Sequence, residues 1–104
     1  LVPAAAIAQS EGDIRLVDGP SPSAGRIEVF HDGQWGTVCD DNMDQQDATV
    51  VCRQLGFGAP SSWDDDQGDP PQFGAGVGQI WMDNTNCVGN ENRLVDCPFA
   101  GFGS

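Results

Sequence analysis

The segment from Gly33 to Gly56 constrains the fold of this chain more than any other. Gln34 to Val38 predicts a strand that carries one bulky apolar side chain, Trp35, which is expected to anchor the core. A helix is predicted over roughly Gln45 to Leu55, since apolar residues recur there at the spacing of one helix face, namely at Ala48, Val51, Cys52 and Leu55. A strand, a helix and two cysteines in so short a span predict the nucleus of a small domain.

The predicted helix has recognisable ends. Asp44 is a favoured N-cap residue, and Asp47 in the first turn complements the helix dipole. Gly56 is a typical stop signal.

Further strands are predicted at Ile14 to Val17, Arg26 to Phe30 and Gln79 to Met82. The Asp-Gly pair at Asp32 predicts a hairpin turn. Asp18 to Ser23 is expected to form a turn-rich loop, and a short helical turn is expected to begin at Asn90 or Glu91. Residues 57–78 lack a regular pattern and predict a long surface loop, where function often lies.

Four cysteines stand in a small chain with 14 glycines and 7 prolines: Cys39, Cys52, Cys87 and Cys97. None forms a C-x-x-C pair, which disfavours a zinc ribbon or a dithiol redox motif. A disulfide framework in an oxidising compartment is the better interpretation. Spacing alone leaves all three pairings of four cysteines open.

The charge balance is strongly acidic. Sixteen Asp and Glu residues face four arginines, so the formal net charge is -12. Direct binding to nucleic acid is disfavoured, because that binding depends on clustered Lys and Arg. The acidic surface suits cationic ligands or divalent cations, although it would also serve solubility alone.

The first residues are excluded from the predicted fold. Ala6-Ile7-Ala8 has the small-x-small form of a signal-peptidase site, so residues 1–8 are interpreted as a signal-peptide remnant. An ordinary Ala-rich linker is the alternative. Residues 9–13 are expected to be a polar linker to the domain. No apolar stretch reaches the roughly 18 residues that a membrane-spanning helix needs.

Several separated blocks resemble the scavenger receptor cysteine-rich (SRCR) domain in order and spacing. They are Ile14-Arg15-Leu16-Val17, Gly25-Arg26-Ile27-Glu28-Val29-Phe30, Trp35-Gly36-Thr37-Val38-Cys39-Asp40-Asp41, Val50-Val51-Cys52-Arg53-Gln54-Leu55-Gly56, Ile80-Trp81-Met82-Asp83 and Cys87-Val88-Gly89-Asn90-Glu91, with Leu94 and Cys97. The resemblance runs from Ile14 to the end. It implies an α+β fold in which a small curved antiparallel sheet cradles one α-helix and disulfides staple the structure.

The resemblance also implies a cysteine pattern. Cys87 would pair with Cys97, while Cys39 and Cys52 would remain unpaired here, because their partners in the family follow the point where this chain stops. A bond between Cys39 and Cys52 is the alternative. Phe57 replaces a cysteine of another branch of the family, which favours the six-cysteine (group A-like) branch. Residues 14–104 are therefore expected to be an SRCR domain that lacks its last segment, within a longer protein. Met43 replaces a usual tryptophan, which we interpret as a core substitution.

A calcium site is the sharpest functional expectation. In the family, carboxylates at the positions of Asp40, Asp41 and Glu91 bind calcium and help to engage ligands. Asp83 and Asn84 would complete the set, since calcium takes six to eight oxygen ligands. The simpler alternative is that the adjacent Asp pair caps a turn before the helix.

Other candidate sites are weaker. Trp63 among the carboxylates Asp64, Asp65 and Asp66 is a candidate ligand contact, although this acidic run lacks EF-hand spacing and a solvated loop is the simpler interpretation. The one histidine, His31, lies beside a predicted turn, and no G-x-S-x-G motif is present, so the chain is not expected to be an enzyme.

Two functions follow from these expectations. The first is a secreted or cell-surface module that uses calcium to recognise extracellular or microbial-surface ligands, whether polyanions or proteins. The second is an accessory domain, without a ligand of its own, in a larger extracellular enzyme or receptor.

Overall fold

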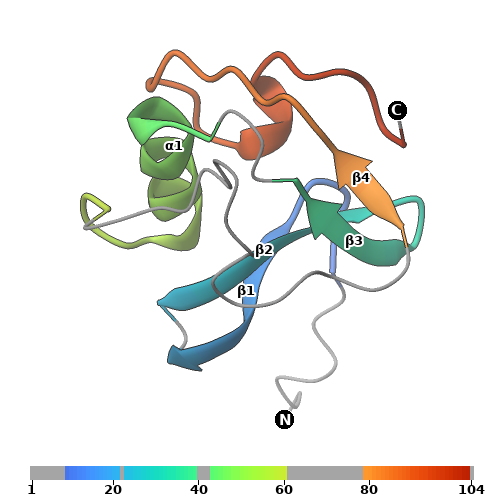
Figure 1. The fold of residues 1–104 in the computed structure, drawn as a ribbon, viewed down its shortest axis with the longest axis horizontal. Coiled ribbons are helices and arrows are strands. Elements are labelled where there is room, and N and C mark those ends of the chain that lie inside the picture. The colour runs from blue at the N-terminus through green and yellow to red at the C-terminus, as the bar shows by residue number, and fades with distance from the viewer. Residues whose placement is uncertain (1–8, 22, 40–42, 61–78, 104) are drawn as a thin grey trace, which may run out of the picture.

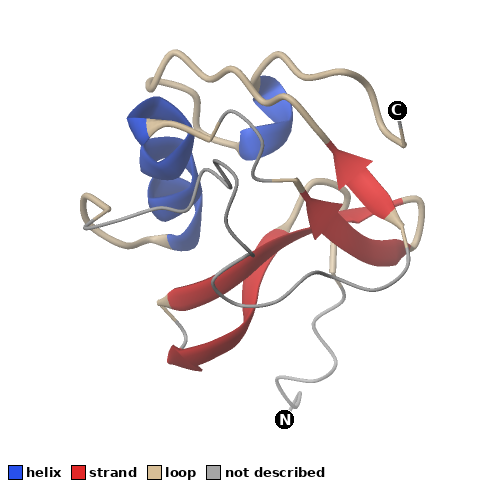
Figure 2. Ribbon diagram, in the orientation of Figure 1, coloured by secondary structure: helices blue, strands red, loops and turns tan. Residues whose placement is uncertain are grey.

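The computed structural model describes residues 9–21, 23–39, 43–60 and 79–103. Four strands form one sheet in the order β1-β2-β3-β4: β1 (Ile14–Ser21), β2 (Ala24–His31), β3 (Gln34–Val38) and β4 (Ile80–Met82). One helix, α1 (Gln45–Leu55), lies to one side of this sheet, and a short 3-10 helix, η2 (Leu94–Asp96), lies near it (Figure 1). Figure 2 shows that loops make up most of the chain after β4.

The α+β fold class is confirmed, with one correction to the strand pairing. Strands β1, β2 and β3 pair antiparallel, as expected from the hairpin signal at Asp32 and Gly33. Strand β4, however, pairs parallel to β3, with Thr37 opposite Ile80 and Val38 opposite Met82. A long connection separates these two strands, and such a connection permits parallel pairing where a short turn does not.

Helix α1 has the bounds that the sequence predicts. Asp44 caps it through a side-chain oxygen that accepts the Asp47 N–H. In turn, the side chain of Asp47 accepts the Asp44 N–H. Gly56 ends the helix in the left-handed conformation with φ of 81°. Only glycine adopts that conformation without steric cost, which explains the stop.

The prediction of a turn-rich loop over residues 18–23 is wrong for most of that range. Strand β1 runs on to Ser21, with an irregular register after Val17, and Asp18 adopts a φ of 63°. Pro20 fits within this strand because β1 is an edge strand, whose outer side makes no ladder hydrogen bonds. The segment expected to be a linker is bonded to the sheet, since the Gly12 N–H donates to the carbonyl of Phe30.

The core lies between the sheet, α1 and the segment around η2. Val29, Val50, Met82 and Leu94 are fully buried and belong to one apolar cluster. Met43 is also buried, consistent with a core substitution. Trp35, expected to anchor the core, is only half-buried: it lies edge-on to Phe30 and under the guanidinium of Arg15, 4.2 Å from its ring centre. No helix within the described ranges is long and apolar enough to cross a membrane.

Candidate functional site

The parallel pairing of β3 and β4 brings the ends of two strands to the same edge of the sheet. Beyond the last ladder pair, the Cys39 N–H donates to the carbonyl of Met82 at 2.8 Å. Asp83 follows Met82 directly, and the predicted ligands Asp40 and Asp41 follow Cys39. Those two residues lie outside the described part of the chain, as do the candidate ligand contacts Trp63, Asp64, Asp65 and Asp66.

The segment that leaves β4 is fixed by its own hydrogen bonds. The Asp83 carboxylate accepts the Asn84 N–H at 2.8 Å, and Asn84 adopts a φ of 55°, which asparagine tolerates better than most residues. The Asp83 carbonyl accepts the Ala100 N–H. Thr85 is 2% exposed, and its hydroxyl has no hydrogen-bond partner within the described residues. A buried hydroxyl of this kind is unusual and calls for a polar neighbour.

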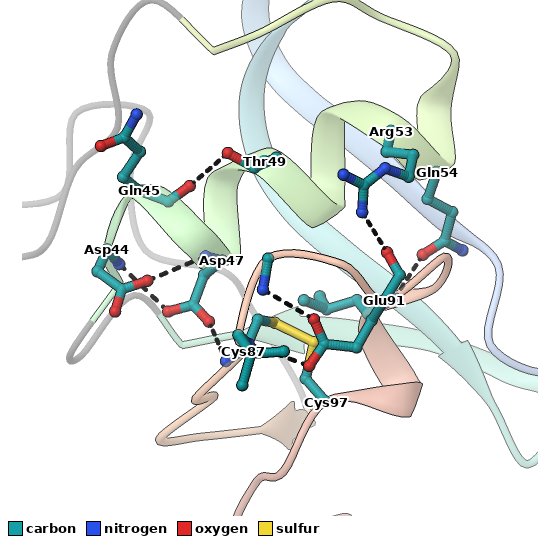
Figure 3. Close-up of a disulfide and its surroundings, with 12 residues drawn as sticks. Asp44, Gln45, Asp47, Thr49, Arg53, Gln54, Cys87, Glu91 and Cys97 are labelled. Atoms are coloured by element: carbon teal, nitrogen blue, oxygen red, sulfur yellow. Dashed lines mark hydrogen bonds between the residues drawn. A yellow bond between two sulfur atoms is a disulfide. The ribbon is translucent and has the colours of Figure 1, made fainter.

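Glu91 lies in a rigid loop closed by the Cys87–Cys97 disulfide (Figure 3). Its two carboxylate oxygens accept the Val88 and Gly89 N–H groups, each at 3.0 Å. The hydrogen bond from Val88 is the main cause that holds the pKa of Glu91 below its usual value. Backbone groups of Gly89, Asn90 and Glu91 itself lower the pKa further, so the backbone of its own loop favours the ionised carboxylate.

Asp47 joins this loop to α1, and the sequence analysis missed that role. Its side chain is fully buried and accepts the Cys87 N–H at 2.8 Å (Figure 3). Burial away from water is the main cause that raises the pKa of Asp47 to about 6, and the nearby Asp44 carboxylate adds to the shift. The available sequence signal was the spacing of Asp44 and Asp47, which is that of a capping box.

The side chains of Arg53 and Gln54 complete the attachment of the Glu91 loop to α1. Arg53 donates to the carbonyl of Glu91 at 2.7 Å. Gln54 donates to the carbonyl of Gly12 and accepts the Leu94 N–H at 2.8 Å. The end of α1 therefore positions both the Glu91 loop and the segment that enters the sheet.

The group formed by Cys87, Glu91 and Cys97 has the spacing of a metal site but is not one. Ligand atoms of Cys87, Glu91 and Cys97 lie within 4.8 Å of one another, but the two sulfurs are bonded to each other and are not thiolate ligands. Cys52 carries a free thiol, so the alternative Cys39–Cys52 bond is wrong in this structure. Burial raises the pKa of the Cys52 thiol, which makes it less reactive.

Comparison with solved structures supports the same fold. The third SRCR domain of murine neurotrypsin matches with a TM-score of 0.66 and 46% identity, over 82% of this chain and 76% of that one. The SRCR domain of mouse MARCO, in its dimeric form, matches with a TM-score of 0.61 and 37% identity, over 99% and 86% of the two chains.

Curated relatives are much longer than this chain. An SRCR domain superfamily protein of Patiria pectinifera is 48% identical over 93 residues, which are 89% of this chain and 8% of that protein. Lysyl oxidase homolog 4 of Homo sapiens is 52% identical over 91 residues, which are 86% of this chain and 12% of that protein.

The family model of the scavenger receptor cysteine-rich domain matches residues 17–104. Domains of this family are non-catalytic binding modules of extracellular proteins or ectodomains, and they also occur as accessory domains in larger enzymes such as lysyl oxidase homologs. The match covers most of the chain and agrees with its sheet, helix and disulfide. The chain therefore belongs to the scavenger receptor cysteine-rich family.

Proposed function

We propose that this chain is a secreted or cell-surface module in which calcium helps to recognise extracellular or microbial-surface ligands. The proposed ligands of the ion are Asp40, Asp41 and Glu91, with Asp83 and Asn84 completing the set. One observation carries the proposal: the Cys39 N–H is bonded to the carbonyl of Met82, so the residues directly before Asp40 and Asp83 are neighbours in the structure.

The donor chemistry fits a hard cation. Every proposed side-chain ligand offers oxygen, which is what calcium prefers in proteins, and neither sulfur nor imidazole is required. The hydrogen bonds to Glu91 favour its ionised form, as a metal ligand needs. The Thr85 hydroxyl, which has no hydrogen-bond partner among the described residues, lies one residue past Asn84, so a polar partner on that side would satisfy it.

Charge gives the ion a clear role in recognition. A chain with a net charge of -12 repels polyanions, and only four arginines oppose that charge. Two of them, Arg15 and Arg26, pair with Glu28. A bound calcium ion would offer positive charge where the side chains do not, so polyanionic ligands would bind through it. Trp63 and residues 64–66 stay predicted ligand contacts.

Calcium titration by calorimetry tests this proposal. We expect saturable binding to the 104-residue chain, and we expect Asp41→Ala and Glu91→Gln to abolish or strongly weaken it. Asp32→Asn is the matched control, because it removes one exposed carboxylate at a turn with φ of 52°, a conformation that asparagine accepts. Equal calcium binding by the wild-type protein and all three variants would contradict the proposed site. So would the absence of binding to the wild-type protein at millimolar calcium.

An accessory role without a ligand is the second candidate, favoured by the similarity to lysyl oxidase homolog 4. Binding of a sulfated polysaccharide to the immobilised domain, with calcium and then with a chelator, separates the two candidates. Calcium-dependent binding supports the recognition module. Calcium binding by the domain without any polysaccharide or protein ligand would favour the accessory role.

A further inference from the structure

The segment after η2 returns along the outer side of β4. Two backbone hydrogen bonds hold it there: the Ala100 N–H donates to the carbonyl of Asp83, and the Gly103 N–H donates to the carbonyl of Trp81 at 3.0 Å. We refer to residues 99–103 as the strap. In Figure 1 the strap runs beside β4 toward the C-terminus. Since β4 is an edge strand of only three residues, the strap covers backbone groups that would otherwise face solvent.

The single histidine of the chain contacts this strap. The imidazole of His31, at the end of β2, lies parallel to the ring of Phe102 with 3.6 Å between ring centres and 4° between planes. It also lies edge-on to Trp81, with 4.6 Å between centres. Phe102 in turn packs edge-on against Phe99. One ring therefore joins the sheet to the strap through aromatic contacts.

The same imidazole contacts the segment that enters the sheet. Its Nδ1 lies 2.5 Å from Oε2 of Glu11, and the other oxygen of that carboxylate accepts the Asp32 N–H. The hydrogen bond with His31 is the main cause that lowers the pKa of Glu11, so this carboxylate stays charged at neutral pH. Arg93 donates to the carbonyl of Glu11. The chain segments at both ends of the domain thus meet at one side chain.

We propose that His31 is a protonation-dependent clasp that holds the strap against the sheet more tightly when its imidazole is charged. An imidazolium gains attraction from the face of the Phe102 ring, which only the closed strap brings to it, while the Glu11 carboxylate orients the same imidazole from the other side. Histidine is the side chain whose ordinary titration lies between pH 5 and 8. The clasp therefore tightens on mild acidification and loosens in alkaline solution.

Three charged groups surround the imidazole within the described residues. They are the Glu11 carboxylate bonded to it, the exposed Asp32 next to it in the chain, and Arg93, which is bonded to the backbone of Glu11. Trp81 and Phe102 carry no charge. Only the contact between the charged imidazole and the Phe102 ring differs between the closed and the open strap, and a cation over one aromatic face predicts up to about a fivefold change in their ratio.

Hydrogen exchange at single amides tests the clasp in the whole 104-residue chain. We expect the protection factors of the Ala100 and Gly103 amides to be about fivefold higher at pH 5.5 than at pH 7.5, at low salt. The amide of Phe57, bonded to the carbonyl of Cys52 at the far end of α1, should keep the same protection at both values and controls for global changes.

Two variants make the test specific. His31→Gln retains a polar side chain that cannot be charged, so the pH dependence of strap protection should vanish. Phe102→Leu keeps an apolar side chain without a ring, so protection should fall at both pH values and the pH difference should shrink. Equal protection of the strap at both pH values in the wild-type protein would overturn the clasp, as would an unchanged pH difference in His31→Gln.

Discussion

Replacement of Asp47 by asparagine should make the protein less sensitive to pH. The carboxylate of Asp47 is fully buried, and its pKa is raised to about 6 from an ordinary 3.8, mainly by burial. The folded protein therefore holds a proton that the unfolded chain releases between these two values. The contribution of Asp47 to the free energy of unfolding is therefore largest below pH 4, and it is lost as the pH rises to 6 and above.

The size of the effect follows from the shift. A difference of about two pKa units corresponds to about 3 kcal/mol of free energy of unfolding. This is an upper value, because Asp44 beside it is partly exposed and solvent screens part of the interaction. Asparagine resembles the protonated acid in having no charge, and its oxygen can accept the Cys87 N–H. Its NH2 group cannot accept the Asp44 N–H as the carboxylate does, and this loss costs the same free energy at every pH. Relative to wild type, Asp47→Asn should therefore gain up to about 3 kcal/mol between pH 4 and pH 7.

Urea denaturation followed by tryptophan fluorescence measures this difference. Wild type, Asp47→Asn and the control Asp96→Asn, which removes an exposed carboxylate on η2, are unfolded at pH 4 and at pH 7. The comparison uses the difference between variant and wild type at each pH, so a constant cost of the substitution cancels. A difference that stays constant within about 0.5 kcal/mol, or that moves against the variant at pH 7, would refute burial as the dominant cause.

Two further substitutions test the packing and the polar contacts. Gly36→Ala should destabilise the fold by about 1–3 kcal/mol, because a Cβ there would lie 2.4 Å from Cδ1 of Trp81 and 2.8 Å from the carbonyl oxygen of Gln79; a thermal midpoint equal to that of wild type would show that β4 moves freely away from β3. Gln54→Ala should cost about 1–3 kcal/mol, because it leaves the Leu94 N–H and the Gly12 carbonyl without their partner; faster hydrogen exchange at the Leu94 amide should accompany the loss, and unchanged exchange would contradict it.

Local chemistry explains which elements could be predicted from the sequence. The bounds of α1 depend on Asp44, Asp47 and Gly56, all within or beside the helix, and the structure has those bounds. The Cys87–Cys97 disulfide is present as the resemblance implied. By contrast, the parallel pairing of β4 depends on a strand partner more than 40 residues earlier in the chain, which no local pattern reveals.

Burial was the hardest property to predict for single residues. Trp35 was expected in the core from its size, but Arg15 covers its ring and it stays half-buried. Asp47 was assigned only a helix-dipole role from its charge and position, but its side chain is fully buried and accepts the Cys87 N–H. In the candidate site, Glu91 and Asp83 stay predicted ligands, and the hydrogen bonds that fix their side chains come from backbone groups that a sequence does not place.

These contacts change the meaning of the acidic composition. A net charge of -12 suggests a surface covered with free carboxylates, yet several acids have internal partners. Glu28 is shared by Arg15 and Arg26, the Asp47 carboxylate accepts buried N–H groups, and that of Glu91 holds its own loop together. In a small domain with long loops, backbone N–H groups far outnumber the ladder bonds available, and carboxylates satisfy them well. Some of the acidity is therefore structural, and the net charge alone does not measure how many carboxylates remain available to a cation.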